Sequence, residues 1–172
     1  KNNLTRYQTY HDVNEGQTAR QVVATVNTNT DYAYYDYDLE TDTNQDYLML
    51  VNKYYHLDAS YQPNDLVDIS NQYYYGEGHQ IRKIVYDAFI DMWNQAKNDG
   101  IYLIINSSYR TYEEQQSVYD GYKNSYGTTY ADSIAARPGY SEHQTGLSLD
   151  IFSTEYTTTA NFKGSPAYEW LV

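Results

Sequence analysis

The stretch from Arg137 to Ile151 carries the side chains of this sequence that are most able to do chemistry. A proline–glycine pair near its start favours a loop, and His143 follows, seven residues before Asp150. From Leu147 onward apolar and polar residues alternate, which predicts a strand with Asp150 on the face opposite the aliphatic side chains. A loop imidazole and a strand carboxylate at this spacing can converge on one point. Both are good ligands for a zinc-like ion.

The same two residues have a simpler interpretation. Most single histidines lie on a protein surface, and most single aspartates are solvated or cap a helix. Two ligands also do not complete a zinc site, because a catalytic zinc normally takes three ligands from the protein. Spacing alone therefore leaves both interpretations of His143 and Asp150 open.

A second candidate group lies upstream, where a predicted core strand meets a helix. The run from Ile101 to Ile105 is continuously apolar and of strand length, and Thr111 with Glu114 forms a capping box that starts a helix. Arg110 lies between these elements, a rigid place from which a guanidinium can capture a carboxylate in bidentate fashion. Gln115, on the first turns of the helix, can project toward the same region. The alternative is an ordinary surface arginine.

Composition limits the classes of partner. The 172 residues are enough for one domain with a real core. The chain has 11 Lys and Arg against 23 Asp and Glu, a net charge of −12, so nucleic acid is not an expected partner. The absence of cysteine excludes disulfides, thiolate metal sites and a cysteine nucleophile. The 24 tyrosines could suit a surface that binds sugars or peptides, but a general compositional bias, with tyrosines in the core and on strands, explains them better.

The remaining patterns predict helices, strands and loops around these groups. No apolar run is long enough for a membrane helix. The sequence as given shows no signal peptide, and any signal or anchor segment is expected to have been removed or to lie outside these residues. Two further regions, residues 27–44 and 54–68, are predicted to be mainly loop, with His56 as a loop residue. The predicted elements are a weak helix over Lys1–Val13, a helix capped by Thr18 with an apolar stripe of valines, a strand over Leu48–Val51, a long helix with its stripe from Ile81 to Ala96, a short helix over Thr129–Ala136 and a helix starting at Ser165 or Pro166.

Two motifs carry a family resemblance. The run Ser107-Ser108-Tyr109-Arg110 with Gln115 five residues on, together with the stretch from Arg137 to Ile151, resembles the VanY-type D-alanyl-D-alanine carboxypeptidases, a group that includes LdcB-type L,D-carboxypeptidases and VanX-type dipeptidases. The segment from Leu48 to Lys53 is similar to the family's strand ahead of the catalytic domain, and Tyr7–Asn27 to the N-terminal extension of some members.

The resemblance implies a fold and a domain plan. The fold is expected to be α+β, with a small, mainly antiparallel sheet and helices packed on one side. Residues 1–172 are expected to form a single carboxypeptidase-like domain. About residues 1–45 would be an N-terminal helical and loop extension, and 46–172 the catalytic core, incomplete at its C-terminal end.

The resemblance also implies roles for individual residues. His143 and Asp150 would be two ligands of one catalytic zinc ion. Arg110, Gln115 and Ser141 would hold the terminal carboxylate of a peptidoglycan stem peptide ending in D-alanine. The protein would act outside the cell or on its surface, at the bacterial cell wall. Neither nucleic acid nor a partner protein is expected.

One part of the family pattern is missing from the sequence. The family places its third zinc ligand and its catalytic glutamate in a Glu-x-x-His motif downstream of the Asp-bearing strand, and no such motif occurs here. No catalytic residue is therefore assigned within this chain, and the motif is expected beyond Val172, where an apolar helical pattern is just beginning. We expect a fragment of an active enzyme that binds zinc weakly or not at all. The alternatives are a noncatalytic wall-peptide-binding module that uses Arg110, Gln115 and Ser141, and a structural protein with a decayed site.

Overall fold

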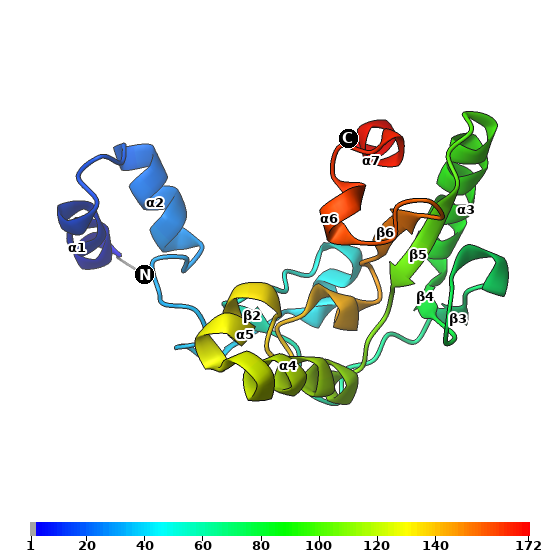
Figure 1. The fold of residues 1–172 in the computed structure, drawn as a ribbon. Helices are drawn as coiled ribbons and strands as arrows, with labels where there is room; N and C mark the ends of the chain where they lie inside the picture. Colours follow the sequence, from blue (N-terminus) through cyan, green and yellow to red (C-terminus); the bar gives the residue numbers. More distant parts are fainter. Residues whose placement is uncertain (1–2) are drawn as a thin grey trace.

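The computed structural model describes residues 3–172 and has a mixed α+β architecture (Figure 1). The helices are α1 (Leu4–Val13), α2 (Ala19–Asn27), α3 (Lys83–Asn98), α4 (Tyr112–Tyr126), α5 (Thr128–Ile134), α6 (Thr159–Phe162) and α7 (Pro166–Leu171). The strands are β1 (Leu39–Glu40), β2 (Tyr55–His56), β3 (Leu66–Asp68), β4 (Gln80–Arg82), β5 (Leu103–Ser107) and β6 (Asp150–Ser153). Short 3-10 helices are η1 (Thr43–Leu48), η2 (Asn71–Tyr73) and η3 (Glu142–Thr145).

The strands pair two by two and are mostly antiparallel. β3 pairs with β4 and β5 with β6 in antiparallel fashion, whereas the short β1–β2 pair is parallel. Helix α3 packs against β3, β4 and β5, and the main core lies between them. That core consists of Ile69, Tyr73, Ile81, Phe89 and Ile105, all buried. The expected α+β class with a small, mainly antiparallel sheet is confirmed.

The helices begin and end largely where the sequence predicts. Thr111 and Glu114 form both hydrogen bonds of the predicted capping box at the start of α4, and Thr18 does the same for α2 with Gln21. Gly100 has a φ of +81°, which suits a glycine just after the end of α3. The predicted N-terminal helix forms over Leu4–Val13, and residues 1 and 2 of that prediction lie outside the described part of the chain.

Two strand predictions are wrong in part. Leu48–Val51 is not a strand. The Asp42 side chain caps the 3-10 helix η1, which ends at Leu48, and that leucine is 83% exposed. The strand predicted from Leu147 begins only at Asp150, because Gly146 adopts a left-handed φ of +67° and the Leu147 N–H donates to Thr145 Oγ1 instead of to a neighbouring strand.

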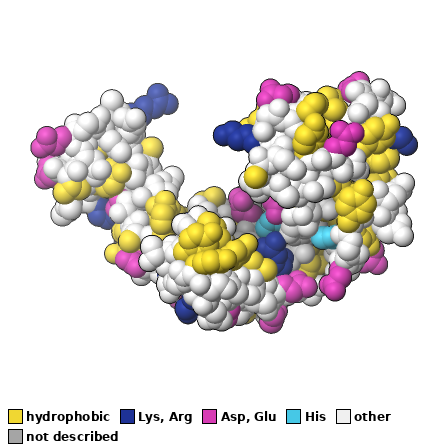
Figure 2. Space-filling view, in the orientation of Figure 1, with side chains coloured by type: hydrophobic (Ala, Val, Ile, Leu, Met, Phe, Trp, Pro, Cys, Tyr) yellow, Lys and Arg dark blue, Asp and Glu magenta, His cyan; other side chains and the backbone are white. Residues whose placement is uncertain are grey.

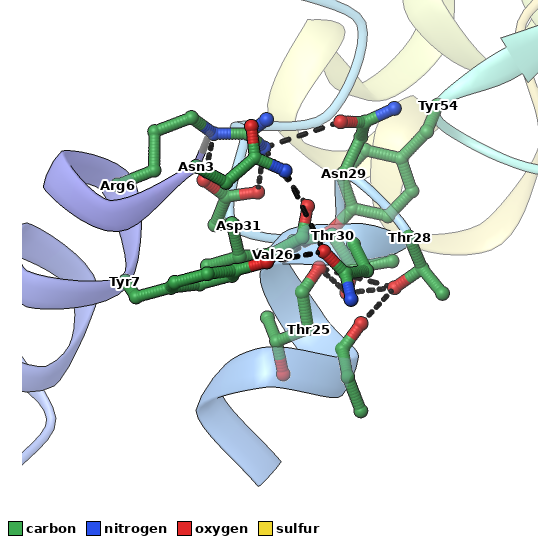
Figure 3. Close-up of polar contacts among 12 residues, drawn as sticks. Asn3, Arg6, Tyr7, Thr25, Val26, Thr28, Asn29, Thr30, Asp31 and Tyr54 are labelled. Carbon is green, nitrogen blue, oxygen red and sulfur yellow. Dashed lines mark hydrogen bonds and ion pairs between the residues drawn. The ribbon is translucent and has the colours of Figure 1, made fainter. Parts of the chain in front are cut away.

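The N-terminal helices α1 and α2 stand beside the rest of the molecule and form one arm of a U-shaped outline (Figure 1). Helix α1 has no buried residue. Its Arg6 donates to both carboxylate oxygens of Asp31, at 3.1 and 2.6 Å, and to the carbonyl of Val26, and these polar contacts tie α1 to the chain that follows α2 (Figure 3). Among residues 3–172, no helix has both the length and the apolar character needed to cross a membrane.

Candidate metal and carboxylate site

The five predicted site residues line one cavity. Arg110, Gln115, Ser141, His143 and Asp150 all border a hollow of about 720 Å³. They come from the β5–α4 junction, η3 and its N-cap, and the start of β6. In the space-filling view, histidine, basic and acidic side chains meet at the base of the concave face (Figure 2). Residues up to 40 positions apart in the sequence are thus brought together around one hollow, and their roles there stay predictions.

The pairing of β5 with β6 places Asp150. Ser107 lies opposite Asp150, and the register shifts between Ile105 and Ser107. Such a bulge bends a strand and redirects its side chains, here at the end of β5 that leads into Arg110. The bulge therefore brings the aspartate and the arginine-bearing junction to the same wall of the cavity.

The ring of His143 is held in a defined orientation. Its Nδ1 lies 2.7 Å from the carbonyl oxygen of Ser108, and a carbonyl can only accept, so Nδ1 carries the hydrogen. In the neutral ring, the lone pair is then on Nε2, which lies 3.3 Å from Oδ2 of Asp150. The ring thus turns its ligand nitrogen toward the carboxylate.

The separation of these two atoms fits a shared metal ion. A tetrahedral zinc with nitrogen and oxygen ligands at about 2.0–2.1 Å holds them about 3.3 Å apart, and the observed distance is 3.3 Å. When the His143 ring is protonated, Nε2 carries a hydrogen as well and donates to Asp150, and this hydrogen bond lowers the pKa of Asp150 against the opposing effect of burial. The carboxylate is therefore ionised at neutral pH, as a ligand must be. Within residues 3–172, no group of three His, Cys, Asp or Glu residues is placed to hold a metal.

Arg110 presents a partly satisfied guanidinium to the same cavity. Its Nη1 donates to Oε1 of Gln115, and its Nη2 donates to Oγ of Ser107 at 2.6 Å. Burial lowers the pKa of Arg110, while the nearby charge of Asp150 raises it. A guanidinium has five N–H donors, and the other three make no hydrogen bond to the part of the chain that the structure describes. Arg110 can therefore receive an anionic group from the cavity.

Gln115 and Ser141 are less free than Arg110. Gln115 is 2% exposed, and its Nε2 donates to the carbonyl of Ala136 at 2.7 Å while its Oε1 accepts from Arg110. Ser141 is 5% exposed and its Oγ accepts the N–H of His143 at 3.4 Å. Both side chains support a neighbour in the site, and each keeps one hydrogen that can reach a ligand.

Sequence reasoning missed the contribution of Ser108. This residue belongs to the family motif, but its part in the site is a backbone carbonyl and a buried hydroxyl. Any residue has a carbonyl, so no residue type could have signalled this contact. Two other residues also line the cavity, Asn52 and Lys53. The sequence analysis named them only within the segment from Leu48 to Lys53, which was likened to a strand, and assigned them no role in the site.

Comparison with known proteins places the chain in a family. The family model for VanY, described as D-alanyl-D-alanine carboxypeptidase, matches residues 78–172. The protein is 41% identical over 119 residues to YodJ of Bacillus subtilis (strain 168), which is named as a carboxypeptidase, and the match covers 67% of this chain and 44% of YodJ. The chain belongs to the VanY D-alanyl-D-alanine carboxypeptidase family.

Solved structures share the fold. The LdcB LD-carboxypeptidase has a TM-score of 0.70 and 33% identity, with 81% of this chain and 68% of that chain covered. VanYB in complex with D-alanine-D-alanine has a TM-score of 0.58 and 32% identity, and the match covers 71% of this chain and 66% of VanYB. A mutant of the vancomycin resistance D,D-pentapeptidase VanY in complex with Zn(II) has a TM-score of 0.56 and 33% identity, covering 71% and 67%. The chain spans less than half the length of the curated relatives that it matches, 42–46%.

Proposed function

We propose that this protein is a zinc-dependent carboxypeptidase that removes a C-terminal D-alanine from peptidoglycan stem peptides. The observation that carries the proposal is the position of Arg110, whose unpaired N–H groups face the same cavity as the His143–Asp150 pair. A cation that binds a terminal carboxylate next to a metal site is the arrangement that an exopeptidase needs. The family and the D-alanine-D-alanine complex of VanYB support D-alanine as the terminal residue.

The roles of the residues follow from their chemistry. Arg110 binds the terminal carboxylate by charge-assisted hydrogen bonds, Gln115 and Ser107 hold the guanidinium in place, and Ser141 adds a hydroxyl at the cavity wall. His143 and Asp150 would hold a zinc ion, and the chemistry that such an ion would supply is activation of water and polarisation of the scissile carbonyl. The third ligand and the general base are assigned to a Glu-x-x-His motif outside residues 1–172. Activity at the cell wall, outside the cell, follows from the substrate.

Peptide binding tests the carboxylate clamp. We expect the 172-residue chain to bind a short peptide ending in D-Ala-D-Ala, measured by calorimetry, and Arg110→Ala to weaken that binding about 10- to 100-fold, since a hydrogen bond to a charged group contributes about 1.5–3 kcal/mol. Arg20→Ala is the matched control, because Arg20 is an exposed arginine on α2. A peptide with an amidated C-terminus should bind no better to the wild type than to Arg110→Ala. Equal binding of the free acid by both proteins would contradict the clamp.

Metal analysis tests the zinc assignment. With two ligands, residues 1–172 should bind zinc weakly and lose it on gel filtration, and His143→Ala should abolish the remaining binding. A longer form of the protein that carries Glu-x-x-His should retain one zinc and release D-alanine. A zinc ion held stoichiometrically and tightly by residues 1–172 alone would show that this chain supplies a third ligand.

A noncatalytic peptide-binding module is the second candidate. The observation in its favour is that Arg110 keeps N–H donors free beside the cavity, whereas within residues 3–172 no three potential metal ligands are grouped together. The two candidates differ in one measurement. The binding module predicts that a longer form binds the D-Ala-D-Ala peptide through Arg110 without releasing D-alanine, whether or not zinc is added.

A further inference from the structure

We propose that His79 is a positioning residue for His143, acting through Ser108. The inference rests on the proposed metal site. It adds to that site a residue next to β4, a strand that supplies none of the five predicted site residues. His79 immediately precedes β4 and lines a separate pocket of about 490 Å³ with Tyr74, Tyr109 and Glu114. It therefore approaches the site from behind the β5–α4 junction and does not face the cavity that holds Arg110.

A continuous path of hydrogen bonds joins the two histidines. Nδ1 of His79 lies 2.9 Å from Oγ of Ser108, and the carbonyl oxygen of the same serine lies 2.7 Å from Nδ1 of His143. Ser108 is 1% exposed, so water does not compete for either contact. One buried residue thus contacts one histidine through its side chain and the other through its backbone.

His79 is itself fixed in place. Its carbonyl accepts the N–H of Ile69 at 2.9 Å, which extends the β3–β4 pairing, and the Tyr74 ring packs edge-on against the imidazole with centroids 4.8 Å apart. Desolvation by burial lowers the pKa of His79. A neutral, held imidazole can therefore fix the Ser108 hydroxyl for as long as the sheet is intact.

The backbone contacts around Ser108 leave His79 a specific task. The Tyr109 N–H donates to the Gln80 carbonyl at 2.9 Å, and the Arg110 N–H donates to the His143 carbonyl at 3.2 Å. The first of these bonds anchors the peptide group between Ser108 and Tyr109, whose oxygen meets His143. The hydrogen bond between the Ser108 side chain and His79 anchors the same residue at a second point, so His79 refines the direction of that carbonyl.

The consequence for His143 concerns its tautomer. The hydrogen bond made by one ring nitrogen sets which nitrogen is free to bind a metal. If the Ser108 carbonyl rotates away, Nδ1 loses its acceptor, and hydrogen on Nε2 would block the nitrogen that faces Asp150. His79 thus favours the metal-binding tautomer of His143 indirectly, through Ser108.

Two readouts on the 172-residue chain test this inference, and one needs no metal. Nitrogen-15 NMR of the imidazole rings should show Nδ1–H at His143 in the wild type, and a shift toward Nε2–H in His79→Ala and in Ser108→Ala. Zinc titration by calorimetry should show each variant binding about threefold to tenfold more weakly, at the low end of the 10- to 100-fold effect of direct contacts to metal ligands. The double variant should be no weaker than the weaker single variant.

Controls separate positioning from folding and from the proposed function. His79→Asn keeps an amide near the position of Nδ1 and should restore most of the tautomer and of the affinity, while exposed His11→Ala should change neither. If His79→Ala does not fold, as judged by circular dichroism, His79→Asn and Ser108→Ala decide the question. An unchanged His143 tautomer in Ser108→Ala and His79→Ala would overturn the inference. Failure of a longer form that carries Glu-x-x-His to bind zinc, with the tautomer effect intact, would instead count against the metal site.

Discussion

The site and the N-terminal helices are built by different means. Part of the site is anchored to the β5–β6 pair of the core: Asp150 pairs with β5, and the Ser108 carbonyl that orients His143 follows that strand directly. Helix α1 buries nothing and is tied down by exposed or half-buried polar contacts, chiefly the Arg6–Asp31 ion pair. Such contacts contribute little individually, whereas packing in a core fixes positions closely. The comparison indicates that side chains needed at fixed distances belong on the core, and that the arm contributes little to the geometry of the site.

The largest expected difference comes from truncating the core beneath the site. Ile105 is 1% exposed and lies just before the bulge that positions Asp150. Ile105→Ala should reduce the free energy of unfolding by about 2–5 kcal/mol, because it removes a buried side chain and leaves a cavity. Urea denaturation followed by tryptophan fluorescence measures the effect. Val26→Ala, at a fully buried position of α2, should reduce the free energy of unfolding by less and should leave D-Ala-D-Ala peptide binding unchanged. If both variants weakened peptide binding equally, the contrast between the two regions would be wrong.

A smaller effect is expected where a buried polar group loses its partner. Gln115→Leu removes the acceptor of Arg110 Nη1 and the donor to the Ala136 carbonyl. Unpaired buried groups cost about 1–3 kcal/mol, so thermal denaturation should show a lower Tm and peptide binding should weaken. The half-buried glutamine next in sequence serves as the control, as Gln116→Leu removes only a bond to Asp120. If the two variants behave alike, Gln115 does not position the guanidinium.

Acid titration gives a third test of the site. The pKa of Asp150 is lower in the folded protein than in the unfolded chain, chiefly through its hydrogen bond with His143. The stability it contributes is therefore present above its unfolded pKa of about 3.9 and is lost as the pH falls through the folded value. Asp150→Asn should make stability less steeply dependent on pH below about pH 4, as measured by urea unfolding across that range. If the free energy of unfolding of Asp150→Asn depends on pH below about 4 as the wild type's does, the contact between Asp150 and His143 does not form in solution.

The smallest effect is expected in the arm. Arg6→Ala removes a partly exposed ion pair and should cost about 1 kcal/mol or less. Hydrogen exchange should become faster in α1 and α2 while β5, β6 and peptide binding stay as in the wild type. Faster exchange at β5 would mean that the arm and the site are coupled, and would remove the contrast between the two regions.

The sequence by itself predicted most of the main elements and named the residues of the candidate site. The stripe that forms α3, the capping boxes of α2 and α4, and the position of Arg110 between a core strand and a helix all depend on local spacing, which periodicity reports. His143, Asp150, Arg110, Gln115 and Ser141 were all named from motifs, and all border one cavity. Their assigned roles stay predictions until the binding experiments are done.

Tertiary structure alone decided how these groups meet. Leu48–Val51 looked like a strand because it is apolar, but Leu48 ends η1 and is exposed, and within residues 3–172 no strand pairs with this segment. The 3.3 Å approach of His143 to Asp150 depends on the β5–β6 register and on the carbonyl of Ser108. The link from His79 passes through the same residue. Register and carbonyl direction are properties of the folded backbone, which every residue type shares, and so no reading of side chains along the chain could have supplied them.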